Sequence, residues 1–254
     1  MDNHEELRSA ICELYAVFGE YPRPSKIKYC VCGCTKPEEI SALLAAPLPD
    51  LPFDSLANYS FKAMTTQGSV NDFKYFLPRL LEGITQETYR YNPEILFGKL
   101  PCGKWLTWDD KEIAAVRGYL IALWRSGLCL YPLQVHFPAF FEIGSILGSL
   151  ANTGDRLDPY LLIWDETTSL EADQHLIQFV TLYGSEFSNG KALSSGYWET
   201  IEQPDVLRRW ILKPETLERI KRSKHLLLKD GYEHLFGPAL EILHAESSVL
   251  NQRS

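Results

Sequence analysis

The stretch "WDDKEIAAVRGYLIALWRSG" (residues 108–127) shows the pattern that decides the fold. Its apolar residues recur every three or four positions, the spacing of one helix face: Ile113, Val116, Tyr119, Leu120, Leu123 and Trp124. Thr107 and Asp110 form a capping pattern at its start, and acidic residues in its first turn suit the positive end of the helix dipole. The stretch therefore predicts a long amphipathic helix that packs against a core.

The same helical spacing recurs along most of the chain, while the two-residue alternation of strands is nearly absent. The best strand candidate, "CLYPLQVHF" (129–137), contains Pro132, which has no backbone N–H to donate to a sheet. Helices of about ten to eighteen residues joined by short turns are typical of helical bundles. We therefore expect an all-α fold, an irregular orthogonal bundle of about ten helices with no substantial β-sheet.

Two capping boxes mark predicted helix starts in the first third of the chain. Thr35 and Glu38 mark the start of a short helix, and Ser69 and Asp72 mark the start of a helix over residues 70–84. In such a box the hydroxyl and the carboxylate each accept a hydrogen bond from an otherwise unpaired backbone N–H. Both boxes predict where a helix begins and where the preceding loop ends.

Length and composition favour one domain in the cytoplasm. A chain of 254 residues that is 45% hydrophobic can bury a large core, and its weak candidate boundary lies near residues 152–154. We therefore expect a single all-helical domain over residues 1–254. The N-terminus lacks a signal-peptide pattern, and no run of about 18 apolar residues occurs. A cytoplasmic location is the expectation, with the six cysteines as thiols or ligands rather than disulfides.

Cys30, Cys32 and Cys34 lie within five positions in "CVCGC" (residues 30–34), named here the cysteine loop. Alternate residues of an extended loop point to one side, so the three thiols can approach one ion. Zinc is the metal that this residue type favours, because thiolates bind it readily. The cysteine loop is therefore the best metal-site candidate in the chain.

Two other interpretations of the cysteine loop stay open: thiols that carry out redox chemistry, and inert thiols in a turn. A closed tetrahedral zinc site needs a fourth ligand, for which the candidates are Cys12, Cys102, Cys129 or a histidine. The C-x-x-C spacing of many zinc and redox sites is absent. Without a fourth ligand, the loop is a turn with inert thiols that joins the first helix to the next.

Three strings carry a resemblance that covers roughly residues 25–125: the cysteine loop, "FKAMTTQGSVNDFKYFLPRLLE" (61–82) and "EILFGKLPCGKWLTWDDKEIAAVRGYLIALW" (94–124). Together they resemble an uncharacterised family of bacterial hypothetical proteins, and FKAMTT and DFKYFLPRLLE are the most specific parts. The resemblance implies a bacterial cytosolic protein and brings no activity and no catalytic residue with it.

Charge is distributed unevenly in the C-terminal half. Residues 155–205, the acidic stretch, hold ten acidic and two basic residues, and residues 208–229, the basic stretch, hold eight basic and two acidic residues. An acidic stretch followed directly by a basic stretch predicts either a polarised surface or two solvated helix faces of opposite charge. Trp210 in the basic stretch is a candidate for stacking on a base, but the whole chain carries a net charge of −8. Nucleic acid is therefore not the expected partner.

Sequence motifs for common enzyme classes are absent. The chain has no G-x-G-x-x-G, no Walker loop, no H-E-x-x-H and no G-x-S-x-G. An enzyme with a dispersed active site stays an alternative, as does a zinc-binding protein that uses the cysteine loop.

The acidic stretch favours a non-enzymatic protein-binding module. We expect a bacterial immunity protein that neutralises a toxin by masking its basic active-site surface, because opposite charges steer association. The partner-binding residues expected on this basis are Asp155, Asp158, Asp165, Glu166, Glu171 and Asp173, with Trp164 as an aromatic anchor.

Overall fold

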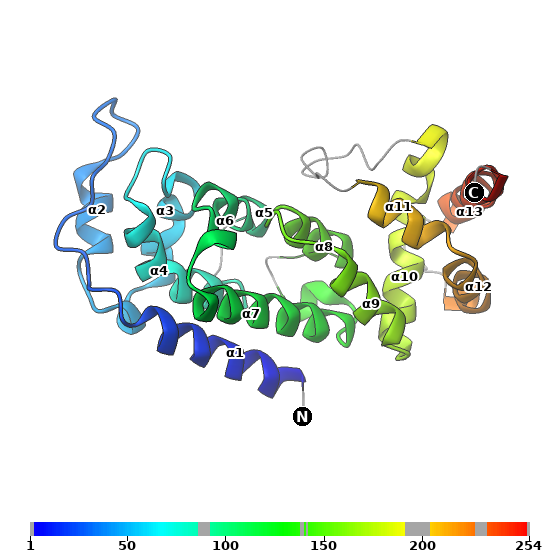
Figure 1. The fold of residues 1–254 in the computed structure, drawn as a ribbon, viewed down its shortest axis with the longest axis horizontal. Coiled ribbons are helices and arrows are strands. Elements are labelled where there is room, and N and C mark those ends of the chain that lie inside the picture. The colour runs from blue at the N-terminus through cyan, green and yellow to red at the C-terminus, as the bar shows by residue number, and fades with distance from the viewer. Residues whose placement is uncertain are drawn as a thin grey trace. The chain divides into compact units, whose positions relative to one another are not determined.

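The computed structural model describes residues 3–85, 92–137, 140, 142–190, 204–226 and 233–252 (Figure 1). Over these residues the fold is all-α, as predicted, and β-pairing is limited to two isolated bridges that both involve Gln67. No described helix combines the length and the apolar content that crossing a membrane requires.

The helices group into two compact units, one formed by residues 1–126 with 134–141 and the other by 127–133 with 142–254. The change from the first unit to the second falls in the last turn of a long helix, away from residues 152–154. Whether the chain folds as a single domain stays a prediction.

The first unit contains seven labelled α-helices within its described residues, and the seventh ends in the second unit. They are α1 (Asn3–Phe18), α2 (Pro37–Leu43), α3 (Ala57–Lys62), α4 (Val70–Gly83), α5 (Pro93–Phe97), α6 (Lys99–Cys102) and α7 (Asp110–Leu128). Helix α1 packs against α4, where Tyr15 donates a hydrogen bond to Glu82 at 2.6 Å. Helix α7 is tied to α4 by Tyr119, whose hydroxyl donates to the carbonyl of Leu81 at 2.8 Å.

The decisive stretch of the sequence forms α7, and its predicted face lies inside. Val116, Tyr119, Leu120, Leu123 and Trp124 are all fully buried. Ile113, which the spacing also places on this face, is only half-buried. The periodicity therefore predicts the packed face of the helix correctly apart from its first position.

A buried ion pair joins the start of α7 to α4. Lys74 lies 2.7 Å from Glu112, and both side chains contact the hydroxyl of Tyr21. The Lys74 ammonium also lies over the ring of Trp108, 4.5 Å from its centroid. Although burial opposes ionisation, the hydrogen bonds from Lys74 and Tyr21 hold the pKa of Glu112 below its ordinary value.

One of the two predicted capping boxes is confirmed and the other is wrong. Ser69 accepts from the N–H of Asp72, and the Asp72 carboxylate accepts from the N–H of Ser69 at 2.7 Å, so α4 begins as predicted. Helix α2 instead has Lys36 at its N-cap without a side-chain cap. The buried Thr35 hydroxyl accepts a hydrogen bond from the Gln67 side chain, so tertiary contact has replaced the local cap.

The predicted cap at the start of α7 is also wrong. The helix begins at Asp110, and the Thr107 hydroxyl donates to the carbonyl of Lys104 instead of accepting from the helix. The Glu112 carboxylate accepts from the N–H of Asp109 at 3.1 Å, which satisfies a backbone donor at the helix start.

The second unit is built on α8 (Ile143–Ala151), α9 (Asp158–Glu166), α10 (Leu170–Tyr183), α11 (Pro204–Leu212), α12 (Pro214–Ser223) and α13 (Glu233–Gln252). Helix α8 is buried along almost its whole length, and α10 contacts α12 and α13. Trp164 of α9 stacks on Trp210 of α11 with ring centroids 4.9 Å apart. The two tryptophans join α9 and α11 in one core.

Candidate functional site

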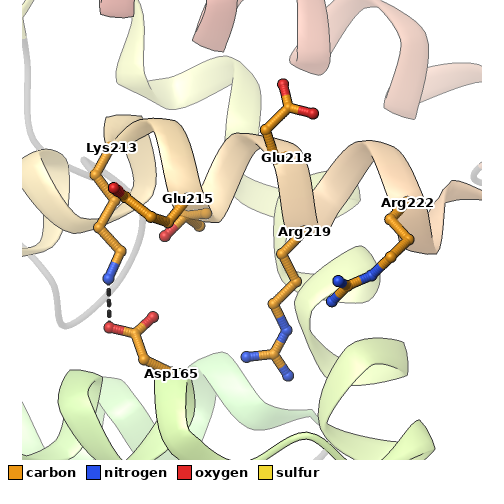
Figure 2. A pocket seen from close by; sticks show the side chains of 7 residues that line it. Asp165, Lys213, Glu215, Glu218, Arg219 and Arg222 are labelled. Atoms are coloured by element: carbon orange, nitrogen blue, oxygen red, sulfur yellow. Dashed lines mark hydrogen bonds and ion pairs between the residues drawn. The ribbon is translucent and has the colours of Figure 1, made fainter.

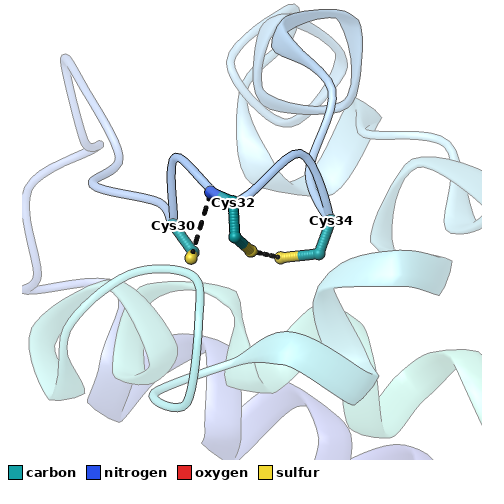
Figure 3. Close-up of side chains that lie close together, drawn as sticks. All are labelled: Cys30, Cys32 and Cys34. Atoms are coloured by element: carbon teal, nitrogen blue, oxygen red, sulfur yellow. Dashed lines mark hydrogen bonds between the residues drawn. The ribbon is translucent and has the colours of Figure 1, made fainter.

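The three sulfur atoms of the cysteine loop gather at one place. The Sγ atoms of Cys30, Cys32 and Cys34 all lie within 4.8 Å of one another, and those of Cys32 and Cys34 are 3.0 Å apart. Figure 3 shows the three side chains on the same side of the loop. The N–H of Cys32 donates to the sulfur of Cys30 at 3.3 Å, which turns the first side chain toward the second.

The backbone of the loop is fixed at its N-terminal end. The N–H of Cys30 donates to the carbonyl of Thr66 at 2.9 Å, and the N–H of Gly68 donates to the carbonyl of Lys28 at 2.8 Å. These bonds pair the residues before the loop with the turn that follows α3. The position of the first thiol is therefore set by main-chain hydrogen bonds.

The C-terminal end of the loop is held by side chains. The Lys62 ammonium donates to the carbonyl of Cys34 at 2.6 Å and to the carboxylate of Glu39 at 2.9 Å. Between the fixed ends, Gly33 has φ = +87°, a left-handed conformation that favours glycine. This turn lets Cys32 and Cys34 point to the same side.

The gathered group contains three potential ligands among the described residues. Cys12 and Cys102, the first candidates for a fourth ligand, are exposed and lie outside this group, and the half-buried Cys129 lies outside it as well. The predicted residues Cys30, Cys32 and Cys34 are thus brought together, and the described part of the chain adds no fourth cysteine, histidine or carboxylate to them.

Three thiolates at this spacing suit a soft metal ion. Zinc–sulfur bonds of about 2.3 Å place the sulfurs of a tetrahedral site about 3.8 Å apart. The sulfurs of Cys32 and Cys34 therefore need to separate by a small side-chain rotation, and Cys32 and Cys34 are exposed enough to do so. The residues present fit zinc as ligands in type and in spacing.

The residues predicted to bind a partner differ from the cysteines, because several of them make contacts inside the second unit. Asp165 is the first of these. Its carboxylate forms an ion pair with Lys213 and accepts a hydrogen bond from the Trp210 indole at 2.9 Å. Figure 2 shows the Lys213 ammonium reaching from the start of α12 to Asp165 at the end of α9. One acidic residue of the predicted surface therefore holds α9 to the basic stretch.

Asp173 has the same role on α10. Its carboxylate accepts from Arg219 at 2.6 Å and from the hydroxyl of Ser223 at 2.8 Å. The Arg219 guanidinium also donates to the carbonyls of Trp164 and Thr167, both at 2.7 Å. The acidic and basic stretches neutralise each other here through contacts inside the unit.

Trp164, the expected aromatic anchor, lies in the core with none of its surface exposed. Its indole N–H donates to the carbonyl of Ala172 at 3.1 Å, so its polar atom is also paired. Its side chain therefore contacts the interior of the unit and is not presented to the solvent.

The remaining acidic residues lie nearer the solvent. Asp158 and Glu166 are exposed, and Asp155 and Glu171 are half-buried. Asp158 forms a weak surface pair with Arg156 at 3.4 Å. The side chains of the predicted surface are thus divided between solvent, ion pairs and core.

Two open hollows border Asp165. One of about 490 Å³ lies along α12 and is lined by Asp165, Lys213, Glu215, Thr216, Glu218, Arg219 and Arg222 (Figure 2). The other, of about 290 Å³, is lined by Asp158, Leu161, Leu162, Asp165, Val206, Arg209, Trp210 and Lys213. Both hollows are lined by acidic and basic residues.

Sequence reasoning missed two features of these sites. Lys62 and Gln67, which support the cysteine loop, lie about thirty residues away in the chain, and no local pattern links them to it. Leu162 of α9 is 56% exposed although it lies within an apolar run of the sequence. Comparison with protein-family models, with curated proteins and with solved structures found no match for this chain.

Proposed function

We propose that this protein binds a zinc ion through the cysteine loop. One observation carries the proposal: three thiol sulfurs lie within 4.8 Å of one another on a loop that hydrogen bonds hold at both ends. Cys30, Cys32 and Cys34 would each lose a proton and donate one sulfur to the ion. The ion would stabilise the turn at Gly33 and draw the loop into one conformation.

Metal titration tests this proposal on the full chain. Cobalt serves as the probe, because its bonds to thiolates give charge-transfer absorption that zinc lacks. We expect one cobalt ion per chain, displaced by zinc. Cys32→Ser should weaken binding by at least about 100-fold, since even second-shell changes at metal sites cost 10–100-fold.

Cys12→Ser is the matched control, because it removes an exposed thiol that lies outside the gathered group. This variant should bind cobalt as the unchanged protein does. Equal binding by both variants, or no charge-transfer absorption at any cobalt concentration, would overturn the proposal.

A second candidate function is the protein-binding module, an immunity protein for a basic toxin. It is favoured by α9, where Leu162 is 56% exposed and lies between Asp158 and Glu166 on one helix face. An exposed apolar side chain with charged neighbours is the composition of a small interface centre with a polar rim. Asp165 and Asp173 are better left unchanged in a test, since they hold Lys213 and Arg219.

The double variant Asp158→Lys and Glu166→Lys tests this candidate. We expect the association rate with the toxin encoded beside the gene to fall by about tenfold at low salt. The two lysines would repel the basic surface of the toxin where the carboxylates attract it. The double variant Glu5→Lys and Glu13→Lys on α1 reverses two exposed carboxylates, which is the same change in net charge, and is the matched control. An association rate that the double variant leaves unchanged would remove the candidate.

A further inference from the structure

We propose that the cysteine loop passes its metal ion to a thiol-bearing partner protein by direct ligand exchange. This inference rests on the proposed zinc binding and adds a fate for the ion. It follows from the number of ligands, from the exposure of the loop and from the charge around it.

The ligand number leaves one coordination position for a group from outside. Zinc in proteins is almost always four-coordinate, and a site with three protein ligands takes its fourth from water or from a reaction partner. The described residues gather three sulfurs and no further potential ligand. A zinc ion bound by Cys30, Cys32 and Cys34 can therefore accept a fourth thiolate without first losing one of its own.

The loop is open to a molecule the size of a protein. Cys32 and Cys34 are exposed, and Val31 between the first two ligands is 97% exposed. Val31 is the residue between Cys30 and Cys32, and Gly33 between Cys32 and Cys34 is exposed as well. Structural zinc sites are closed, with all four positions filled by the protein. This loop has the opposite arrangement.

The charge around the loop favours an incoming thiolate. Lys26, Lys28 and Lys36 flank the cysteines and are exposed, and residues 25–36 contain no acidic residue. Glu38 and Glu39 follow in α2, where the carboxylate of Glu39 is paired with Lys62. A zinc ion with three thiolates carries one net negative charge, and a fourth thiolate adds another. Nearby ammonium groups offset this charge and stabilise the four-thiolate intermediate.

The exchange involves no change in oxidation state. The partner's thiol releases its proton to solvent, and its sulfur donates an electron pair to zinc while the water at the fourth position leaves, which gives a zinc ion with four thiolate ligands. One bond from zinc to a sulfur of the loop then breaks, and that sulfur takes a proton from solvent. Repetition moves the ion to the partner, while the hydrogen bonds of Cys30 and Cys34 to the protein keep the loop in place.

The experiment follows the rate at which cobalt leaves the full-length loaded protein. The acceptor is a synthetic peptide with four cysteines, and the same peptide with serines is its matched control. Direct exchange predicts that the rate of cobalt transfer rises in proportion to the concentration of the cysteine peptide, tenfold for a tenfold increase. The serine peptide should leave the cobalt absorption unchanged.

A transfer rate that does not depend on peptide concentration would overturn the inference, because the ion would then leave before the acceptor binds. That result would leave zinc binding itself intact. Failure of the proposed zinc binding appears earlier and separately, as a protein that shows no thiolate-to-cobalt absorption when it is loaded.

Discussion

The cysteine loop and the acidic stretch both concentrate chemical groups in the sequence, yet they use them in opposite ways. The loop keeps three thiols together and accessible, and its structure depends on backbone bonds to Thr66 and on Lys62 rather than on the thiols. The acidic stretch places Asp165 and Asp173 in ion pairs with the basic stretch. A high local charge in a sequence is therefore weak evidence for a charged surface when an opposite charge follows nearby.

The largest effect that sharpens this comparison is expected at Arg219. Its side chain is 11% exposed and donates to Asp173 and to the carbonyls of Trp164 and Thr167. Arg219→Ala removes the guanidinium from all three acceptors and leaves Asp173 only the Ser223 hydroxyl, so we expect a loss of about 3 kcal/mol in the free energy of unfolding. Urea denaturation measures this loss.

Lys221→Ala is the matched control for Arg219→Ala, because Lys221 lies on the same helix in an exposed pair with Glu218. We expect no measurable change in unfolding from this variant. If the two variants lost the same stability, the charges of the basic stretch would be surface charges after all.

Like Asp165 and Asp173, the side chain of His175 makes its contacts inside the second unit. Its Nε2 donates to the carbonyls of Gly127 and Leu130, and its buried Nδ1 has no hydrogen-bond partner in the described part of the chain. Burial lowers the pKa of His175 from 6.5 to about 4. The folded protein therefore keeps this imidazole neutral at pH values where the unfolded chain binds a proton.

The free energy of unfolding should consequently decrease as the pH is lowered from 6.5 to 4. The unfolded state gains a proton below pH 6.5 and the folded state does not until about pH 4, so His175 contributes a loss of about 3 kcal/mol over this range. Urea denaturation of the unchanged protein and of His175→Gln at each pH isolates the contribution. Parallel pH profiles for the two proteins would contradict it.

The sequence predicts the parts of this molecule that depend on near neighbours. The face of α7 and the capping box of Ser69 and Asp72 were both predictable, because residues three or four apart on a helix are necessarily close. The gathering of the three cysteines is only partly local, since an extended stretch from Cys30 to Cys34 would span roughly 13 Å. The turn at Gly33 brings the sulfurs together.

What the sequence could not predict depends on distant contacts. The cap at Thr35 failed because Gln67, thirty-two residues later, binds its hydroxyl. The surface expected at Asp165, Asp173 and Trp164 depends on α11 and α12, which lie about 45 residues further along. Periodicity and charge counts contain no information about which helices pack together.

A smaller effect is expected at the turn of the cysteine loop. Gly33 has φ = +87°, and apart from Gly33 and its two chain neighbours no residue has an atom within 4 Å of the position that a Cβ would occupy. Gly33→Ala therefore tests the backbone conformation alone, without a steric clash, and should cost about 1 kcal/mol in stability. We also expect weaker cobalt binding, measured by titration, because a relaxed turn separates Cys32 from Cys34. Unchanged stability and binding would show that the left-handed turn is not needed.

The smallest expected effect gives the sharpest contrast with Arg219. Without metal, Cys32→Ser should change the free energy of unfolding by no more than about 0.5 kcal/mol, as is usual for surface substitutions. Its thiol is exposed, and the bonds that fix the loop come from the backbone of Cys30, the carbonyl of Cys34 and the side chain of Lys62. Urea denaturation with a chelator present measures the change. A loss as large as that of Arg219→Ala would mean that the thiols hold the fold together. A change in the free energy of unfolding near zero, together with the loss of cobalt binding, would mean that the thiols serve to bind a ligand. Such thiols would contribute to binding and not to folding.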